Sequence, residues 1–147
     1  MIVNKILGNL KDYDTKHKTI AWVNIHPGDR LKKIVRLKAD NGNEFGINLD
    51  DDVILKDGDV LGEDDENIFV LKCFPQNVIV IKPDTLTQMG FVAHSIGNNH
   101  TPAIFENDTM IVEYDYIIEK MLNEMKVSFE RKDLVLDTPL KHASHHH

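Results

Sequence analysis

The chain has 147 residues, of which 41% are hydrophobic and 28% charged, and its formal net charge is −7 with neutral histidines. These values are typical of a folded globular protein with one or two domains. The acidic balance argues against nucleic acid as the main partner, and no apolar run reaches the roughly 20 residues that span a bilayer, so the sequence predicts neither a nucleic-acid-binding nor a membrane protein.

The first half of the chain alternates short apolar segments with tight turns and shows no clear helical pattern. The turn residues 26–29 and the hairpin signal Asn41-Gly42 separate several of these segments. Expected strands cover residues 2–7, 19–25, 35–38, 45–49, 53–55, 60–61 and 68–71. The sequence therefore predicts an all-β domain, a small sandwich or barrel, over residues 1–74.

A basic run lies in the middle of this predicted domain. It consists of Arg30, Lys32, Lys33, Arg36 and Lys38. Such a run is most often the solvated face of a strand. The alternative is a docking surface for an acidic partner, and the sequence leaves both interpretations open.

The pattern changes after the predicted linker at residues 74–76. Residues 78–81 are a continuous apolar run, as expected of a strand buried on both faces. A helix should follow over residues 84–97, because Thr85 and Gln88 have the spacing of a capping box. Its expected apolar face comprises Leu86, Met89, Ala93 and Ile96, and Gly97 suits the left-handed position after the helix end.

The remaining elements complete a second predicted domain. Residues 103–105 and 110–112 flank a hairpin turn, and Asp115 should cap a second helix with one apolar face. A last strand is expected at residues 127–130. The order βαββαβ predicts an α+β ferredoxin-like domain over residues 75–133, followed by a flexible histidine-containing tail at residues 134–147.

Chemistry other than metal binding is weakly indicated. The acidic clusters at residues 50–52 and 63–66 lack the ligand spacing of a calcium loop and are typical of surface turns. Cys73 has no neighbouring base, so a buried, inert thiol is expected. A small ferredoxin-like acylphosphatase would need an arginine in its phosphate loop, which Asn98-Asn99 does not supply. We therefore expect no enzymatic activity.

A single cysteine and the absence of a signal-peptide pattern in the first residues predict a cytoplasmic protein.

Histidine is the unusual residue type in this chain. His100 should lie on a turn just past the first helix, and four more histidines fall in the last six residues, namely His142, His145, His146 and His147. Imidazole is the commonest side-chain metal ligand, but Ni(II) or Zn(II) takes about four or more donors. The tail could fold over His100, or two chains could share one ion between two copies of His100. A purification-tag remnant is the alternative for the terminal histidines.

The chain resembles the UreE family of urease accessory proteins, which are nickel metallochaperones. The resemblance covers nearly the whole length and rests on Gly58 to Leu61, Gln88-Met89-Gly90, Ile96-Gly97-Asn98-Asn99-His100 and Val112-Glu113-Tyr114-Asp115-Tyr116. The family usually has arginine where Asn99 stands. Some members carry histidine where Ser95 stands, and others where Glu113, Tyr114 and Tyr116 lie.

The resemblance implies a β domain that binds peptide, a ferredoxin-like metal-binding domain, and a head-to-head homodimer with His100 of both chains at the interface. It implies that Ni(II) is a cargo and that the terminal histidines add ligands. Independently of the resemblance, imidazole nitrogen suits Zn(II) and Cu(II), so we expect these ions to substitute in vitro. The implied partners are the urease accessory GTPase (UreG) and the urease apoprotein assembly complex.

The sequence thus predicts a nickel metallochaperone for urease active-site assembly. The rival prediction is a peptide- or protein-binding scaffold of the urease maturation complex with incidental metal binding. In that case the β domain would capture an extended segment at a strand edge.

Overall fold

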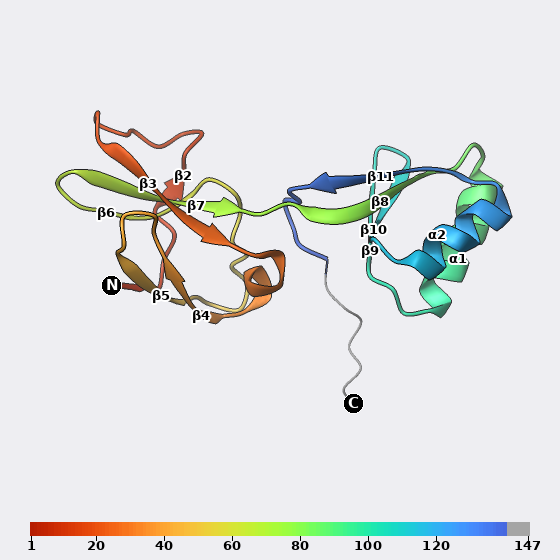
Figure 1. Cartoon of the computed structure of the whole chain (residues 1–147), viewed down its shortest axis with the longest axis horizontal. Helices are drawn as coiled ribbons and strands as arrows, with labels where there is room; N and C mark the ends of the chain where they lie inside the picture. Colours follow the sequence, from red (N-terminus) through yellow and green to blue (C-terminus); the bar gives the residue numbers. More distant parts are fainter. Residues whose placement is uncertain (141–147) are drawn as a thin grey trace. The chain divides into compact units, whose positions relative to one another are not determined.

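The computed structural model describes residues 1–140 (Figure 1), which form two compact units. The N-terminal unit comprises Met1–Pro75 together with Val135–Pro139, and the C-terminal unit comprises Gln76–Leu134 and, among the described residues, Leu140. We call Val135–Pro139 the return segment, because the chain comes back to the N-terminal unit there after building the other one.

The return segment corrects the prediction of a flexible tail from residue 134. Leu134 is the last residue of a strand, and Leu136 and Leu140 are buried at 7% and 8% exposure. The prediction is therefore wrong for residues 134–140. The predicted tail ligands His142, His145, His146 and His147 lie outside the described residues.

The N-terminal unit contains two sheets and is β-rich, as predicted. The three-stranded sheet has the order β1-β5-β4, formed by Ile2–Val3, Glu44–Asn48 and Ile34–Lys38. The four-stranded sheet has the order β2-β6-β7-β3, formed by Gly8–Asn9, Asp59–Glu63, Asn67–Cys73 and Thr19–Ile25. Side chains of both sheets share one core, in which the Phe45 and Phe69 rings lie 4.9 Å apart.

Three local predictions in this unit are corrected. Of the expected strand 2–7 only Ile2–Val3 (β1) is a strand, and the next strand, β2, begins at Gly8 and belongs to the other sheet. Residues 53–55 form no strand, although Leu55 is buried. The turn expected at residues 26–29 is the start of a 3₁₀ helix, η1 (Pro27–Leu31), because Pro27 has the φ that a first helical residue needs and lacks an N–H to satisfy.

The C-terminal unit is an α+β unit, as predicted. Its strands and helices follow in the order β8 (Gln76–Lys82), α1 (Leu86–Asn98), β9 (Ala103–Glu106), β10 (Thr109–Glu113), α2 (Tyr116–Met125) and β11 (Ser128–Leu134). The sheet order is β11-β8-β10-β9 with every neighbouring pair antiparallel, and both helices lie on the same side of the sheet (Figure 1). The predicted hairpin turn is present, and Asn107 and Asp108 both have positive φ.

The buried face of α1 differs from the predicted one. Val92 and Ile96 are the fully buried residues, and Met89 and Ala93 pack beside them on the core of the unit. Leu86 is 88% exposed, so its assignment to the core was wrong. It lies in the first turn of the helix, at a surface hollow shared with Asp108.

No helix among residues 1–140 is long and apolar enough to cross a membrane.

The loop that carries Tyr13 and Lys18 is hydrogen-bonded to Glu63. We therefore expect the stability of the N-terminal unit to depend on pH in the acid range. The Lys18 ammonium and the Tyr13 hydroxyl each donate to the Glu63 carboxylate at 2.8 Å, and these bonds lower the pKa of Glu63 to about 2. Because this pKa lies below the ordinary 4.5, the stabilisation is complete above pH 4.5 and is lost as the pH falls from 4.5 to 2. Glu63→Gln should therefore reduce the drop in urea midpoint between pH 7 and pH 3.

The control for that measurement is Glu66→Gln, which removes an exposed carboxylate in the adjacent turn. It should leave the drop unchanged, and an equal drop in the Glu63 variant and the wild type would refute the assignment.

Candidate metal site at His100

Helix α1 leads the chain to His100, and its start is capped as the sequence predicts. The Gln88 N–H donates to Thr85 Oγ1 at 3.0 Å. The Gln88 side-chain oxygen accepts from the Asp84 N–H at 2.7 Å, one residue before the usual position of a capping box. Both bonds fix the first turn of the helix.

The end of α1 differs from the prediction in a way that concerns His100 directly. Gly97 belongs to the helix, and the left-handed residue is His100, with φ of 56°. The His100 N–H donates to the Gly97 carbonyl at 3.0 Å, and the Thr101 N–H donates to the Ile96 carbonyl at 3.3 Å. These are the two bonds of a Schellman motif, which usually places glycine where His100 stands.

The left-handed conformation of His100 should carry a measurable cost. A side chain there is strained by about 1 kcal/mol relative to glycine. His100→Gly is therefore expected to be about 1 kcal/mol more stable than His100→Ala in urea unfolding. Asn99→Gly is the matched control, because Asn99 has φ of −88° and glycine should bring no gain there. Equal stability of the two His100 variants would contradict this account.

His100 lines a surface hollow of the C-terminal unit. The other residues that line it are Asn99, Thr101, Pro102, Glu113, Tyr114, Asp115 and Ile118. They come from the turn after α1, from the end of β10 and from the start of α2. One imidazole and the carboxyl-bearing residues Glu113 and Asp115 therefore share one hollow.

Hydrogen bonds fix the part of the hollow that the end of β10 and the start of α2 form. Asp115 caps α2 by accepting from the Ile117 and Ile118 N–H groups at 2.7 and 3.2 Å, as predicted. The Tyr114 hydroxyl donates to Glu119 at 2.9 Å, which raises the pKa of Tyr114. The Arg131 guanidinium lies 3.6 Å from the centre of the Tyr114 ring. This packing holds Tyr114 in place beside the hollow.

Sequence reasoning found His100 but missed Glu113 and Asp115 as its neighbours. No spacing rule could have found them, because the β9–β10 hairpin separates them from His100 along the chain. His94 lies on the exposed side of α1, where its Nε2 is 3.4 Å from the Asn98 side-chain nitrogen, and it does not line the hollow. Within residues 1–140, no three His, Cys, Asp or Glu side chains are grouped closely enough to hold a metal ion.

Cys73 is not a rival site. Its side chain is buried at 3% exposure, and burial raises the pKa of the thiol to about 11. The thiolate is therefore scarce at neutral pH, which confirms the prediction of a buried, inert thiol.

Comparisons with known proteins cover both units. The family described as UreE urease accessory protein, N-terminal domain, matches residues 3–73, and the corresponding C-terminal domain matches residues 76–147. The urease accessory protein UreE of Geobacillus kaustophilus is 39% identical over 147 residues, which cover 100% of this chain and 99% of the relative. That of Corynebacterium efficiens is 42% identical over 153 residues and 100% of both chains. This chain belongs to the UreE urease accessory protein family.

Proposed function

We propose that this chain is a nickel metallochaperone that binds Ni(II) through His100 and delivers it for assembly of the urease active site. The observation that carries the proposal is the presentation of His100 at a left-handed helix end, in a hollow shared with Glu113 and Asp115, in a chain whose family is named for urease. The family is one of accessory proteins and not of enzymes, so the chain catalyses no chemical step.

Two sources complete the ligand set in this proposal. Ni(II) takes about four or more donors, and the described residues of one chain group fewer than three around His100. A homodimer with two His100 side chains at its interface doubles the imidazoles. The terminal residues His142, His145, His146 and His147 supply further nitrogen donors.

The proposal extends to the fold class of the C-terminal unit, the cellular location, the partner and the metal ions. The C-terminal unit is assigned to the ferredoxin-like class on its βαββαβ order and its sheet order. The protein acts in the cytoplasm, and it passes its ion on in a complex with the urease accessory GTPase. Imidazole nitrogen also suits Zn(II) and Cu(II), which substitute for Ni(II) in vitro.

Titration of the dimer with Ni(II) in a calorimeter tests the proposal. His100→Ala should weaken the tightest site by at least about 100-fold, because removal of a ligand costs more than the 10–100-fold typical of residues that only orient ligands. The wild type should bind its tightest ion at one per two chains. His94→Ala is the matched control, because this exposed imidazole lies on α1, six residues before His100, and outside the hollow.

The proposal would be refuted by a His100→Ala protein that keeps its tightest site. A loss of equal size in the His94→Ala control would also refute the assignment of His100 as the main ligand.

A further inference from the structure

The sheet of the C-terminal unit has an apolar stripe on the face that lies away from α1 and α2 (Figure 1), which we call the open face. Side chains alternate between the two faces of a strand, and Ile79 and Met110 belong to the core under the helices. Val78, Val80 and Ile111 therefore point to the open face, where Val80 of β8 pairs with Ile111 of β10. These three side chains are only 0%, 6% and 2% exposed, although neither helix covers that face.

Leu140 is a described residue that can cover this stripe. The chain leaves the return segment after Pro139, and Leu140 belongs to the C-terminal unit again. Its side chain is 8% exposed, yet it is not among the residues of the core between the sheet and the helices. A leucine is buried against other apolar groups, and the stripe is such a surface of the same unit. The burial of Leu140 and the burial of the stripe thus have one common explanation.

The stripe leads to the hollow that contains His100. Glu113 lies two residues after Ile111 on β10, so its side chain is on the same face of the sheet, and it pairs with Val78 of β8. Glu113 also lines the hollow together with His100. A segment that follows β10 from the stripe would therefore reach the hollow after about 7 Å.

We propose that the open face of the C-terminal sheet is the docking surface of the histidine segment, residues 141–147, with Leu140 as the anchor at its start. The segment follows Leu140 directly, and its seven residues can span about 24 Å. That length exceeds the path from the stripe to the hollow several times. Lys141, the first residue of the segment, has the charge that suits the Glu113 carboxylate.

The segment of the same chain is favoured over a free peptide or a second copy because it is tethered. Leu140 already fixes its start, and a short flexible tether gives an effective concentration in the millimolar range. On the β11 side of the stripe, Glu130 forms ion pairs with Lys82 and Lys132 at 3.0 and 3.7 Å. These pairs place charge along that border, so the apolar path from Leu140 follows β8 and β10 toward the hollow.

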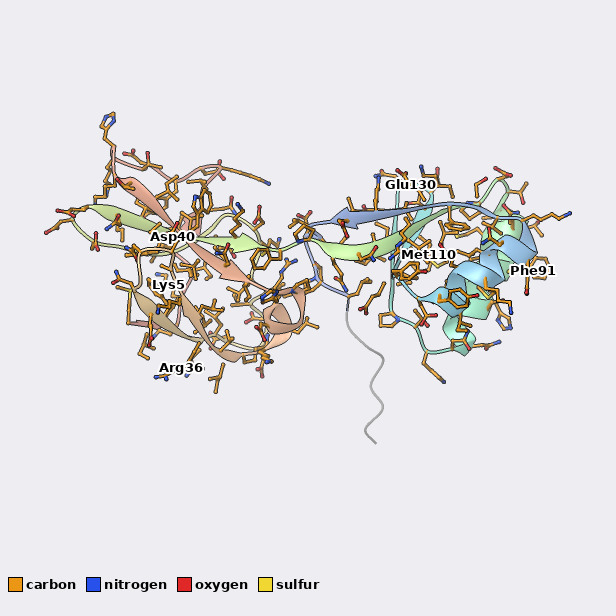
Figure 2. All side chains as sticks on the ribbon, viewed as in Figure 1. Lys5, Arg36, Asp40, Phe91, Met110 and Glu130 are labelled. Atoms are coloured by element: carbon orange, nitrogen blue, oxygen red, sulfur yellow. The ribbon has the colours of Figure 1, made fainter. Side chains whose placement is uncertain are left out.

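A nitroxide label tests the docking on the full-length chain without metal. Ala143→Cys places the label in the histidine segment, and the buried Cys73 thiol, whose pKa is about 11, does not compete for the reagent. The backbone amide signals of Ile111 and Glu113 should lose more than half of their NMR intensity. The signal of Phe91 should lose less, because this residue is on the outer side of α1 and 65% exposed (Figure 2).

Leu140→Ser in the labelled chain tests the anchor. It should restore at least half of the lost intensity, because serine has no apolar side chain to bury against the stripe. The matched control is Val135→Ser, which changes a return-segment residue that is 43% exposed and should leave the intensity losses unchanged. Nuclear Overhauser contacts between the methyl groups of Leu140 and those of Val80 and Ile111 test the same anchor without any substitution.

Three results would overturn the proposal. The first is an equal intensity loss at Glu113 in the labelled chain with and without Leu140→Ser. The second is a greater loss at Phe91 than at Glu113. The third is a loss that appears only in unlabelled chains mixed with labelled ones, which would assign the open face to the histidine segment of a second copy.

Only the consequence for metal binding rests on the proposed function. An anchored segment raises the local concentration of its imidazoles at the hollow, so Leu140→Ser should weaken Ni(II) binding by the dimer about three- to ten-fold. Val135→Ser should leave the isotherm unchanged. If His100→Ala kept the tightest nickel site while the label pattern held, the proposed function would fall and the docking would stand.

Discussion

Arg30→Met is expected to destabilise the N-terminal unit by about 3 kcal/mol, since two buried carbonyls and one partly buried carbonyl would lose their donor. Arg30 is 4% exposed. Its guanidinium donates to the Leu55 carbonyl at 2.9 and 3.2 Å, to the Leu136 carbonyl at 2.7 Å and to the Asp137 carbonyl at 3.1 Å. Methionine fills similar space but donates nothing.

The measurement is urea unfolding followed by the fluorescence of Trp22, the single tryptophan, which lies on β3 of the same unit. Arg36→Met is the matched control, because that arginine is exposed and its loss should change stability by less than about 0.5 kcal/mol. Amide exchange in the return segment should also accelerate in Arg30→Met alone. A variant as stable as the control would show that these hydrogen bonds contribute little.

Ile96→Ala is expected to cost the C-terminal unit about 3 kcal/mol, because it removes a side chain that is 1% exposed and leaves a cavity. The same change should loosen the helix end at His100, since the Ile96 carbonyl accepts the Thr101 N–H that closes the Schellman motif. Amide exchange along α1, measured by mass spectrometry, reports both effects.

Leu86→Ala is the control for this measurement. It truncates an apolar side chain of the same helix that is 88% exposed, so its cost should stay within about 0.5 kcal/mol. Equal acceleration of exchange in the two variants would contradict the burial of Ile96 as the anchor of the helix end.

Local signals predicted much of the fold. The strand Thr19–Ile25 has the predicted bounds, and the hairpin turns and the Asp115 cap depend on residues close together in sequence. The failures have a non-local cause. β11 continues to Leu134 with the polar sequence SFERKDL, because its backbone pairs with β8 over seven residues whatever its hydropathy. Val92 is buried where Leu86 was expected, because packing against the sheet decides which face of α1 is covered.

The candidate site could be predicted only in part, because local signals mark His100 but not the residues that lie near it in the fold. His100 stands out because an imidazole follows a helix-end signal, although the left-handed residue proved to be His100 and not Gly97. The structural role of Arg30 could not be predicted from the basic run that contains it, because its acceptors Leu136 and Asp137 lie more than 100 residues away. No property of the run itself distinguishes that buried arginine from its exposed neighbours.

The acceptors of Arg30 also affect the order of events during synthesis. Leu136 and Asp137 leave the ribosome 106 and 107 residues after Arg30, once Gln76–Leu134 of the C-terminal unit has been made. Until then the guanidinium has only the Leu55 carbonyl and must remain hydrated. The N-terminal unit is translated first but therefore stays incomplete until Gln76–Leu134 has been made, and a fragment cut at residue 75 would lack the return segment that supplies these two acceptors.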